Sequence, residues 1–131
     1  MRLLLDTQIA LWWLVGSPRL KNATRGRIAK AESAISMASA LEVAIKYRIG
    51  KLAVGPQIFL DEMRAAGAII LPISELHVAA YTTLPEGHQD PFDLLLVAVA
   101  RTEKLKLLTA DANLKNYAAL VPGLEVEAPG A

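Results

Sequence analysis

The chain has 131 residues, 53% of them hydrophobic, and a net charge of +1. This length supports one compact domain with a real core, and we expect residues 1–127 to form it without a second domain. The absence of cysteine excludes disulfides, thiolate metal sites and a cysteine nucleophile, and two histidines are too few for an ordinary structural zinc site. Any metal would therefore be held by oxygen ligands, which favours Mg²⁺ with Mn²⁺ as a substitute.

The charge is unevenly distributed along the chain. Residues 1–52 contain nine basic and three acidic residues, whereas residues 53–131 contain five basic and ten acidic ones. This asymmetry permits a basic surface for a polyanion beside an acidic site, although charged surface helices would produce it too. Apolar runs such as residues 94–100 are far shorter than the roughly 20 residues of a spanning helix. We therefore expect a soluble, cytoplasmic protein.

Short apolar runs alternate with helical patterns along the chain. In chain order we expect a strand at 1–5, helices at 8–15 and 22–31, a strand at 34–36, helices at 39–49 and 57–66, a strand at 68–71, a helix at 75–82, a loop at 84–89, a helix at 92–103, a strand at 105–109, a helix at 112–117, an edge strand at 124–126 and a disordered tail at 128–131. This alternation predicts an α/β fold whose central, mainly parallel sheet of four to five strands is flanked by helices.

Three aspartates follow predicted strands or begin the apolar helix. Asp6 ends the first strand, Asp111 ends the strand at 105–109, and Asp93 lies in the first helical turn after a loop. Ligands gather at the carboxyl ends of parallel strands, so we expect the three side chains at one rim. Each could equally be an ordinary helix-capping residue. Together they favour a cation site, because clustered carboxylates repel one another unless a cation lies between them.

Glu42 is the fourth candidate. It falls within an apolar stripe at positions 38, 41, 45, 49 and 52, which we expect to face the core. A carboxylate facing a core is unfavourable unless it is paired or bound to metal. One interpretation is a surface ion pair with Lys46, worth about 0.3–0.5 kcal/mol. The other is that Glu42 points into the acidic rim and Lys46 faces a phosphate.

Four carboxylates around Mg²⁺ suit the hydrolysis of a phosphodiester, because the metal activates a water and neutralises charge on the phosphate. We expect Asp6 and Asp93 to be direct ligands, with the other two acids binding a second ion or orienting the water. Thr7, Ser39 and Thr109 are candidates for hydrogen bonds to ligands or substrate, although lone hydroxyl residues are more often plain caps.

Four ordered motifs resemble those of the PIN-domain ribonucleases, and more narrowly the VapC-type toxins of toxin–antitoxin pairs. They are RLLLDT at 2–7, SALEVAIK at 39–46, HQDPFD at 88–93 and TAD at 109–111. The resemblance implies a PIN-like three-layer sandwich and an RNA endonuclease that needs Mg²⁺ or Mn²⁺. It also implies the acidic quartet Asp6, Glu42, Asp93 and Asp111, a homodimer, and a small DNA-binding antitoxin whose arginine reaches the acidic pocket.

The chain departs from the family pattern at three positions. Gln8 stands where many relatives have His, Leu94 where Arg is frequent, and Val99 where Gln is common. None is one of the four acids, so the implied metal site is unaffected. The loss of the arginine would alter RNA positioning or a structural ion pair.

Two other functional classes compete with a nuclease. A phosphatase site of the haloacid-dehalogenase type needs a second aspartate two residues after the first, and Gln8 occupies that position. A phosphotransfer receiver domain needs an acidic pair before its phospho-acceptor and a lysine after the last core strand, and this pattern is absent too. A non-enzymatic module that only pairs with a regulator is the other alternative, and the four intact acids disfavour it.

Trp12 and Trp13 are adjacent and cannot share one helix face, so we expect one in the core and one exposed for a partner. His88 precedes Asp90 and could contact substrate, although a loop histidine without a role is the favoured interpretation.

Overall fold

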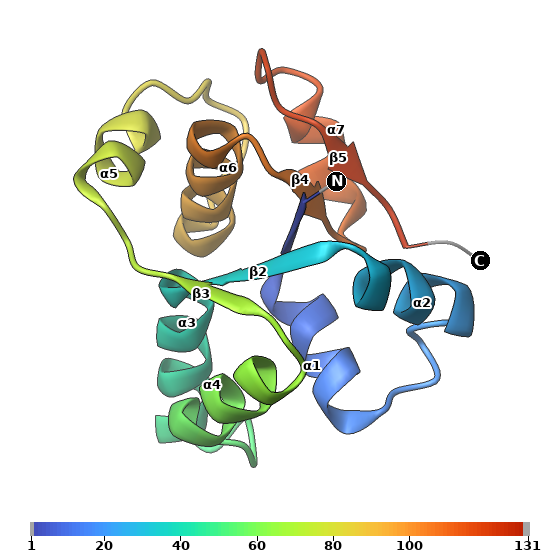
Figure 1. Ribbon diagram of the computed structural model, residues 1–131. Helices are drawn as coiled ribbons and strands as arrows, with labels where there is room; N and C mark the ends of the chain where they lie inside the picture. The colour runs from blue at the N-terminus through green and yellow to red at the C-terminus, as the bar shows by residue number, and fades with distance from the viewer. Residues whose placement is uncertain (1, 130–131) are drawn as a thin grey trace.

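The computed structural model describes residues 2–129, and its centre is a five-stranded parallel sheet (Figure 1). The strand order is β3-β2-β1-β4-β5, and every neighbouring pair is parallel. The strands are β1 (Arg2–Leu5), β2 (Glu32–Ser36), β3 (Ile69–Leu71), β4 (Lys106–Leu108) and β5 (Val126–Glu127). The predicted α/β architecture with a parallel sheet is therefore confirmed.

The first strand shows why the sheet is covered on both faces. Leu3, Leu4 and Leu5 are all buried, and successive side chains of a strand point to opposite faces. Leu3 and Leu5 accordingly belong to one hydrophobic cluster and Leu4 to the other. A strand buried on both faces is a continuous apolar run, which is typical of parallel sheets.

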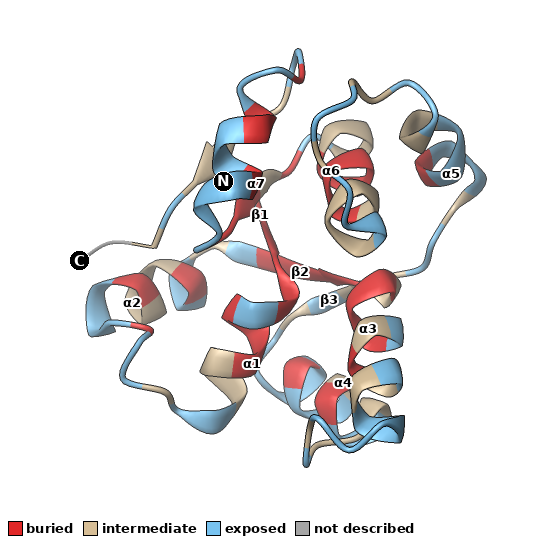
Figure 2. Ribbon diagram, turned by 180° about the vertical axis from the view of Figure 1, so that it is seen from behind, coloured by how far each residue is buried: buried red, intermediate tan, exposed pale blue. Residues whose placement is uncertain are grey.

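Seven helices pack around this sheet (Figures 1 and 2). Residues of α1, α2, α3 and α4 join the cluster that contains Leu3, whereas α6 and α7 join the cluster that contains Leu4. Helix α5 packs against α6. The bounds are α1 (Thr7–Val15), α2 (Asn22–Lys30), α3 (Met37–Arg48), α4 (Pro56–Ala65), α5 (Glu75–Tyr81), α6 (Pro91–Glu103) and α7 (Ala112–Ala118).

The expected core-facing stripe at positions 38, 41, 45, 49 and 52 is wrong for its three middle members, although Ala38 is buried and Leu52 packs against the cluster that contains Leu3. Leu41, Ile45 and Ile49 are 50%, 44% and 60% exposed. The buried positions of this helix are instead small, apart from one valine: Ala38, Ser39, Ala40 and Val43. Small side chains let α3 approach its neighbours closely, so the larger aliphatic residues remain on the outside.

Several element boundaries also differ from the predictions. Helix α3 begins at Met37 because the Ser36 side chain accepts a hydrogen bond from the Ala38 backbone N–H at 3.1 Å, which caps the helix two residues earlier than expected. The last strand is Val126–Glu127 rather than 124–126. Of the predicted disordered tail, 128–129 have no regular structure, and 130–131 lie outside the described residues.

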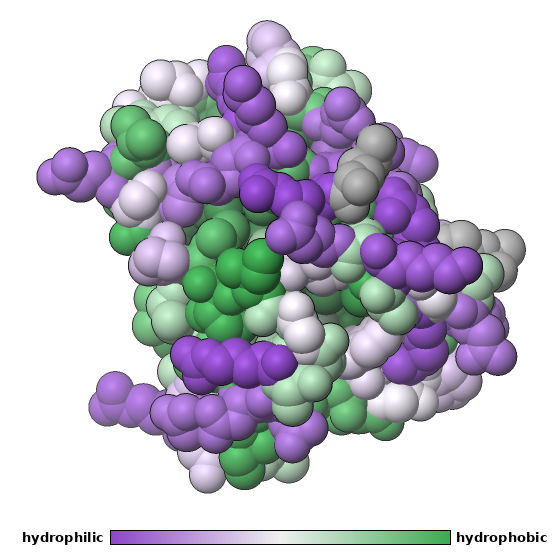
Figure 3. Space-filling model, viewed as in Figure 1, coloured by the Kyte–Doolittle hydropathy of each residue, from purple (hydrophilic) through white to green (hydrophobic). Residues whose placement is uncertain are grey.

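Two further observations concern the length of the helices and the hydrophobic surface near β3. None of the helices within residues 2–129 is long and apolar enough to cross a membrane. Hydrophobic side chains nevertheless gather over the edge strand β3, where Ile69 is exposed (Figure 3). The strand has only three residues and Pro72 follows it, and both features limit pairing with another strand.

Candidate active site

Asp6 connects β1 to α1 and is held by two hydrogen bonds. Its Oδ1 accepts from the Ile9 backbone N–H at 2.8 Å, which makes Asp6 the N-cap of α1, and its Oδ2 accepts from the Thr109 hydroxyl. Only 6% of the residue is exposed. Burial, together with the smaller effect of the charges of Asp93 and Glu42, raises the pKa of Asp6 to about 6 and outweighs the two hydrogen bonds, which lower it. Asp6 is therefore both a cap and a strongly perturbed acid.

Asp93 lies in the first turn of α6 and has an unexpected partner. The Nε2 of His88 is 2.9 Å from the Asp93 Oδ2, and the imidazole lies 5.5 Å from the ring of Tyr117, measured between centroids. The Tyr117 hydroxyl in turn donates to the carbonyl of Pro85. Burial raises the pKa of Asp93, and the hydrogen bond from His88 opposes that rise. His88 is thus not an isolated loop residue, because its imidazole is the hydrogen-bond partner of Asp93.

Asp111 and Glu42 occupy different surroundings. Asp111 is exposed and is the N-cap of α7, accepting from the backbone N–H groups of Asn113 at 2.9 Å and Leu114 at 3.3 Å. Glu42 lies 3.0 Å from the Nζ of Lys46, so the ion pair considered from the sequence is present. That pair does not remove Glu42 from the site, because the residue also lines the pocket described next.

A cavity of about 310 Å³ brings the four predicted acids together at the carboxyl ends of β1 and β4. Asp90 also lines it, although its side chain caps α6 by accepting from the Phe92 N–H at 2.9 Å. No basic residue is among the described residues that line the cavity, which are Asp6, Thr7, Gln8, Trp12, Glu42, Asp90, Asp93, Ala110 and Asp111. We call this cavity the acidic pocket.

The donors of the acidic pocket suit Mg²⁺ in kind. Within residues 2–129 no group of three or more His, Asp or Glu side chains is arranged to hold an ion as it stands. Mg²⁺, however, usually binds proteins through one or two carboxylates and keeps several waters. A cation there would also counter the repulsion that Asp93 and Glu42 exert on Asp6. The oxygen-rich lining therefore fits a hydrated divalent ion.

The three predicted hydroxyl residues form hydrogen bonds within the site. Thr7 lines the pocket and donates to the Ser39 Oγ at 2.9 Å, and Thr109 donates to Asp6. Ser39 and Thr109 are each only 1% exposed. For Thr109 the predicted hydrogen bond to a ligand residue is therefore present, whereas a direct contact of Ser39 or Thr109 with substrate stays a prediction. Their hydroxyls fix Thr7 and Asp6.

The tandem tryptophans are both half-buried, which corrects the expectation of one core and one exposed residue. Trp12 lines the acidic pocket, and the Arg19 guanidinium lies 6.0 Å from its ring centroid. Trp13 packs against the core cluster that contains Leu3, with the Arg25 guanidinium 5.6 Å from its ring. Trp12 therefore presents an aromatic surface beside the acids.

Comparison with known proteins places this geometry in a family. The family model described as "PIN domain" matches residues 3–120, nearly the whole chain. The chain belongs to the PIN domain family. No curated protein matches its sequence. PIN domains are nucleases, and this membership places the chain among them.

Solved structures share the fold at low sequence identity. The structure of VapBC2 from Rickettsia felis, bound to a DNA fragment from its promoter, matches at 22% identity and a TM-score of 0.73, covering 98% of each chain. DNA-bound VapBC from Salmonella typhimurium matches at 15% identity and a TM-score of 0.71, covering 99% of each. The PIN domain endonuclease Utp24 matches at 18% identity and a TM-score of 0.59, covering 99% of this chain and 86% of that one.

Proposed function

We propose that the chain is a Mg²⁺-dependent endoribonuclease, the toxin of a toxin–antitoxin pair, acting in the cytoplasm on RNA phosphodiesters. The observation that carries this proposal is the acidic pocket. The four acids of the motifs come from separate regions of the sequence and line one cavity, and no basic residue is among the described residues of its lining. Such a concentration of carboxylates is unfavourable without a cation.

Asp6 and Asp93 would hold the metal directly, and Glu42 and Asp111 would bind a second ion or orient the attacking water. When bound, the metal would lower the pKa of a water molecule and neutralise charge on the phosphate. The chain's own contribution is to fix the ligands in place. The Thr109 hydroxyl and the Ile9 N–H orient Asp6, while His88 orients Asp93.

Substrate positioning falls to groups at the mouth of the pocket. Lys46 is partly exposed beside Glu42, so its ammonium group can reach a phosphate that enters the site. The half-buried ring of Trp12 offers a surface on which a base can stack. Both residues act on binding, and neither needs to exchange a proton during hydrolysis.

Two partners belong to the proposal. The structural matches to VapBC and to FitAcB from Neisseria gonorrhoeae support an antitoxin. A homodimer is supported by Leu41, Ile45 and Ile49, which are all exposed at successive turns of α3. Glu42 lies on the same helix, so a second copy seated there would lie beside the acidic pocket.

The competing phosphatase function lacks its required second acid. Gln8, two residues after Asp6, is exposed and lines the acidic pocket, so an amide occupies the place where that carboxylate would act. A purely structural binding module would have no need to keep four carboxylates around one cavity. The nuclease therefore accounts for the site better than either alternative.

The proposal is tested by incubating the purified chain with structured and unstructured RNAs in Mg²⁺, in Mn²⁺ and in EDTA. The matched variants are Asp93→Asn in the pocket and Asp61→Asn, an exposed acid of α4 outside it. We expect metal-dependent cleavage by the parent chain and by Asp61→Asn, and none by Asp93→Asn. Cleavage that survives EDTA, or that Asp93→Asn retains in full, would refute the assignment.

A further inference from the structure

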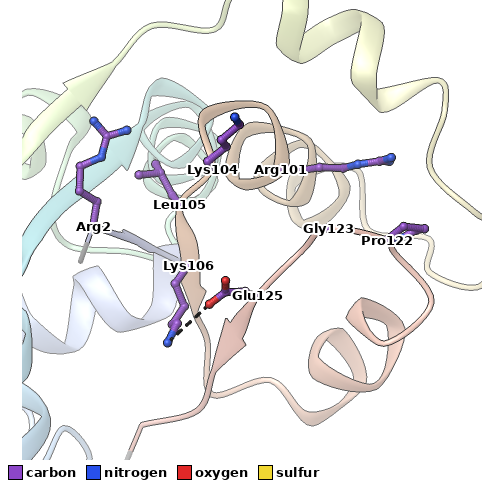
Figure 4. A pocket seen from close by; sticks show the side chains of 8 residues that line it. All are labelled: Arg2, Arg101, Lys104, Leu105, Lys106, Pro122, Gly123 and Glu125. Carbon is purple, nitrogen blue, oxygen red and sulfur yellow. Dashed lines mark ion pairs between the residues drawn. The ribbon is translucent and has the colours of Figure 1, made fainter.

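A second cavity, of about 600 Å³, lies at the amino ends of β1 and β4 (Figure 4), whereas the acidic pocket lies at their carboxyl ends. Its charged lining consists of four cations, Arg2, Arg101, Lys104 and Lys106, and one acid, Glu125. Arg2 begins β1, the strand that ends just before Asp6. The rise of the extended strand therefore places the Cα atoms of Arg2 and Asp6 about 13 Å apart. We call this cavity the basic pocket.

Most of the positive charge in the basic pocket is not neutralised within the fold. Lys106 lies 3.8 Å from both Glu125 and Glu127. Arg2 donates only to the backbone carbonyl of Glu103 at 3.3 Å, and the carboxylate of that residue pairs instead with His77 at 2.9 Å. Arg2, Arg101 and Lys104 form no ion pair with another residue in the described range 2–129.

Lys104 also has an unusual backbone conformation. It is the C-cap of α6 with φ 57° and ψ 45°, and among the described residues it is the only non-glycine residue with a positive φ. Glycine is favoured at such a left-handed position, and a lysine there is strained. The helix C-terminus does favour a cation, but Arg101 already supplies one in the last turn. Strain of this kind concentrates at functional sites.

The arrangement of the cations indicates the shape of the ligand. In Figure 4 the Arg101 side chain extends towards Pro122 and Gly123, whereas Lys106 extends towards Glu125 on another side of the cavity. The charged ends of Arg2, Lys104, Arg101 and Lys106 therefore point in different directions and do not converge on one point. Guanidinium and ammonium groups both recognise phosphate. Several phosphates along a chain match this spread better than a single small anion does.

We propose that the basic pocket binds phosphate groups of an RNA strand that continues beyond the acidic pocket. The pocket would add affinity for longer RNAs and fix the direction in which the strand leaves the cleavage site. The identity of the strand as RNA rests on the function proposed above, whereas the anion site itself does not depend on cleavage.

The test measures binding of a fluorescent single-stranded RNA by anisotropy, in EDTA, over a range of salt concentrations. The pocket variants are Lys104→Gly and Arg101→Gln, and the control is Arg64→Gln, which removes an exposed charge from α4. Removing one cation that binds a phosphate lowers the slope of log K against log salt by about 0.7, which corresponds to about fivefold weaker binding at 0.1 M salt. We expect the lower slope and the weaker binding in both pocket variants, and neither change in the control.

Lys104→Gly separates impaired binding from misfolding. Because glycine relieves the left-handed strain, this variant is expected to melt at a higher temperature than the parent while binding RNA more weakly. Unchanged salt slopes in both pocket variants would overturn the proposal.

Two further probes distinguish other ligands. If Lys104 is needed to bind inorganic pyrophosphate but not RNA, the ligand is a free phosphate compound and the RNA assignment is wrong. If a polyglutamate peptide competes with RNA but pyrophosphate does not, an acidic protein segment is the ligand and the assignment is equally wrong. Since no metal is present, a chain that fails to cleave RNA can still show this binding, so the two proposals fail separately.

Discussion

Replacing Asp6 by asparagine should stabilise the metal-free protein at neutral pH. The folded-state pKa of Asp6 is about 6, against an ordinary value of 3.8, because the carboxyl is buried. A raised pKa means that the folded state holds the Asp6 proton more tightly, so the contribution of Asp6 to stability is fully present well below pH 4 and is lost as pH rises through 6. At about 1.36 kcal/mol per pKa unit, the loss amounts to about 3 kcal/mol. Asparagine carries no charge and caps a helix as well as aspartate does.

The assay is urea unfolding of the parent and of Asp6→Asn in EDTA at pH values between 4 and 7.5. The difference in free energy of unfolding should grow in favour of the variant by about 2.4 kcal/mol across this range, because part of the loss has already occurred at pH 4, and it should level off above pH 7. Asp61→Asn, at an exposed position, should show no such trend. Because we expect the parent to bind Mg²⁺ more tightly than Asp6→Asn, saturating Mg²⁺ should narrow the difference. A difference that is independent of pH would show that Asp6 is not a destabilised buried acid.

Three further predictions concern the supports of the site and the proposed dimer. Thr109→Val removes the hydrogen bond that lowers the pKa of Asp6, so the low-pH limb of the pH–activity profile should move to higher pH while activity near pH 9 is retained. His88→Phe removes the partner of Asp93, and should raise the Mg²⁺ concentration for half-maximal cleavage about 10-fold or more. His88→Asn should restore the Mg²⁺ requirement of the parent only where its amide forms a hydrogen bond with Asp93. Ile45→Glu places a charge in the exposed stripe of α3, and should give a monomer in sedimentation analysis.

Each of these predictions has an outcome that contradicts it. A Thr109→Val profile that is lowered equally at all pH values would indicate misfolding and not a shifted pKa. An unaltered Mg²⁺ requirement in His88→Phe would separate His88 from metal binding. Val15 is another exposed aliphatic residue, outside the α3 stripe, so Val15→Glu is the control for the dimer. If both glutamate variants remain dimeric, the α3 stripe is not the interface.

The placement of Asp6 and Asp111 at the carboxyl ends of the strands was predictable, because it depends on local sequence. A buried strand followed by an aspartate places that carboxylate at the carboxyl end of a parallel sheet, and this holds for Asp6 and, through the loop after β4, for Asp111. The same reasoning located β1 and β4 to within two residues at either end, because their apolar runs are short and clearly bounded.

Glu42 lines the acidic pocket as predicted, but the prediction relied on an incorrect assignment of the buried face of α3. The periodicity of Leu41, Ile45 and Ile49 indicates a helix, but periodicity does not say which face is buried. The small residues at 38–40 decided that question, because they allow closer packing than the larger aliphatic side chains. Sequence patterns therefore located the helix correctly and its buried face incorrectly.

Contacts between distant segments could not be predicted from the sequence. His88 acquires its role through the ring of Tyr117, which arrives from α7, and through a loop that turns the imidazole towards Asp93. The basic pocket likewise combines the start of β1, the end of α6 and the turn before β5. The motif at 88–93 contains both His88 and Asp93 but does not indicate that they form a hydrogen bond, and the residues of the basic pocket share no motif or spacing.

The central claim is that the acidic pocket holds a divalent metal, and direct titration of Mn²⁺ into the folded protein tests it most directly. The bound ion would be counted by electron paramagnetic resonance in the parent, in Asp93→Asn and in Asp61→Asn. We predict binding to the parent and to Asp61→Asn that Mg²⁺ displaces, and binding to Asp93→Asn that is at least about 10-fold weaker. Equal Mn²⁺ affinity in all three proteins, or none in the parent, would contradict the account.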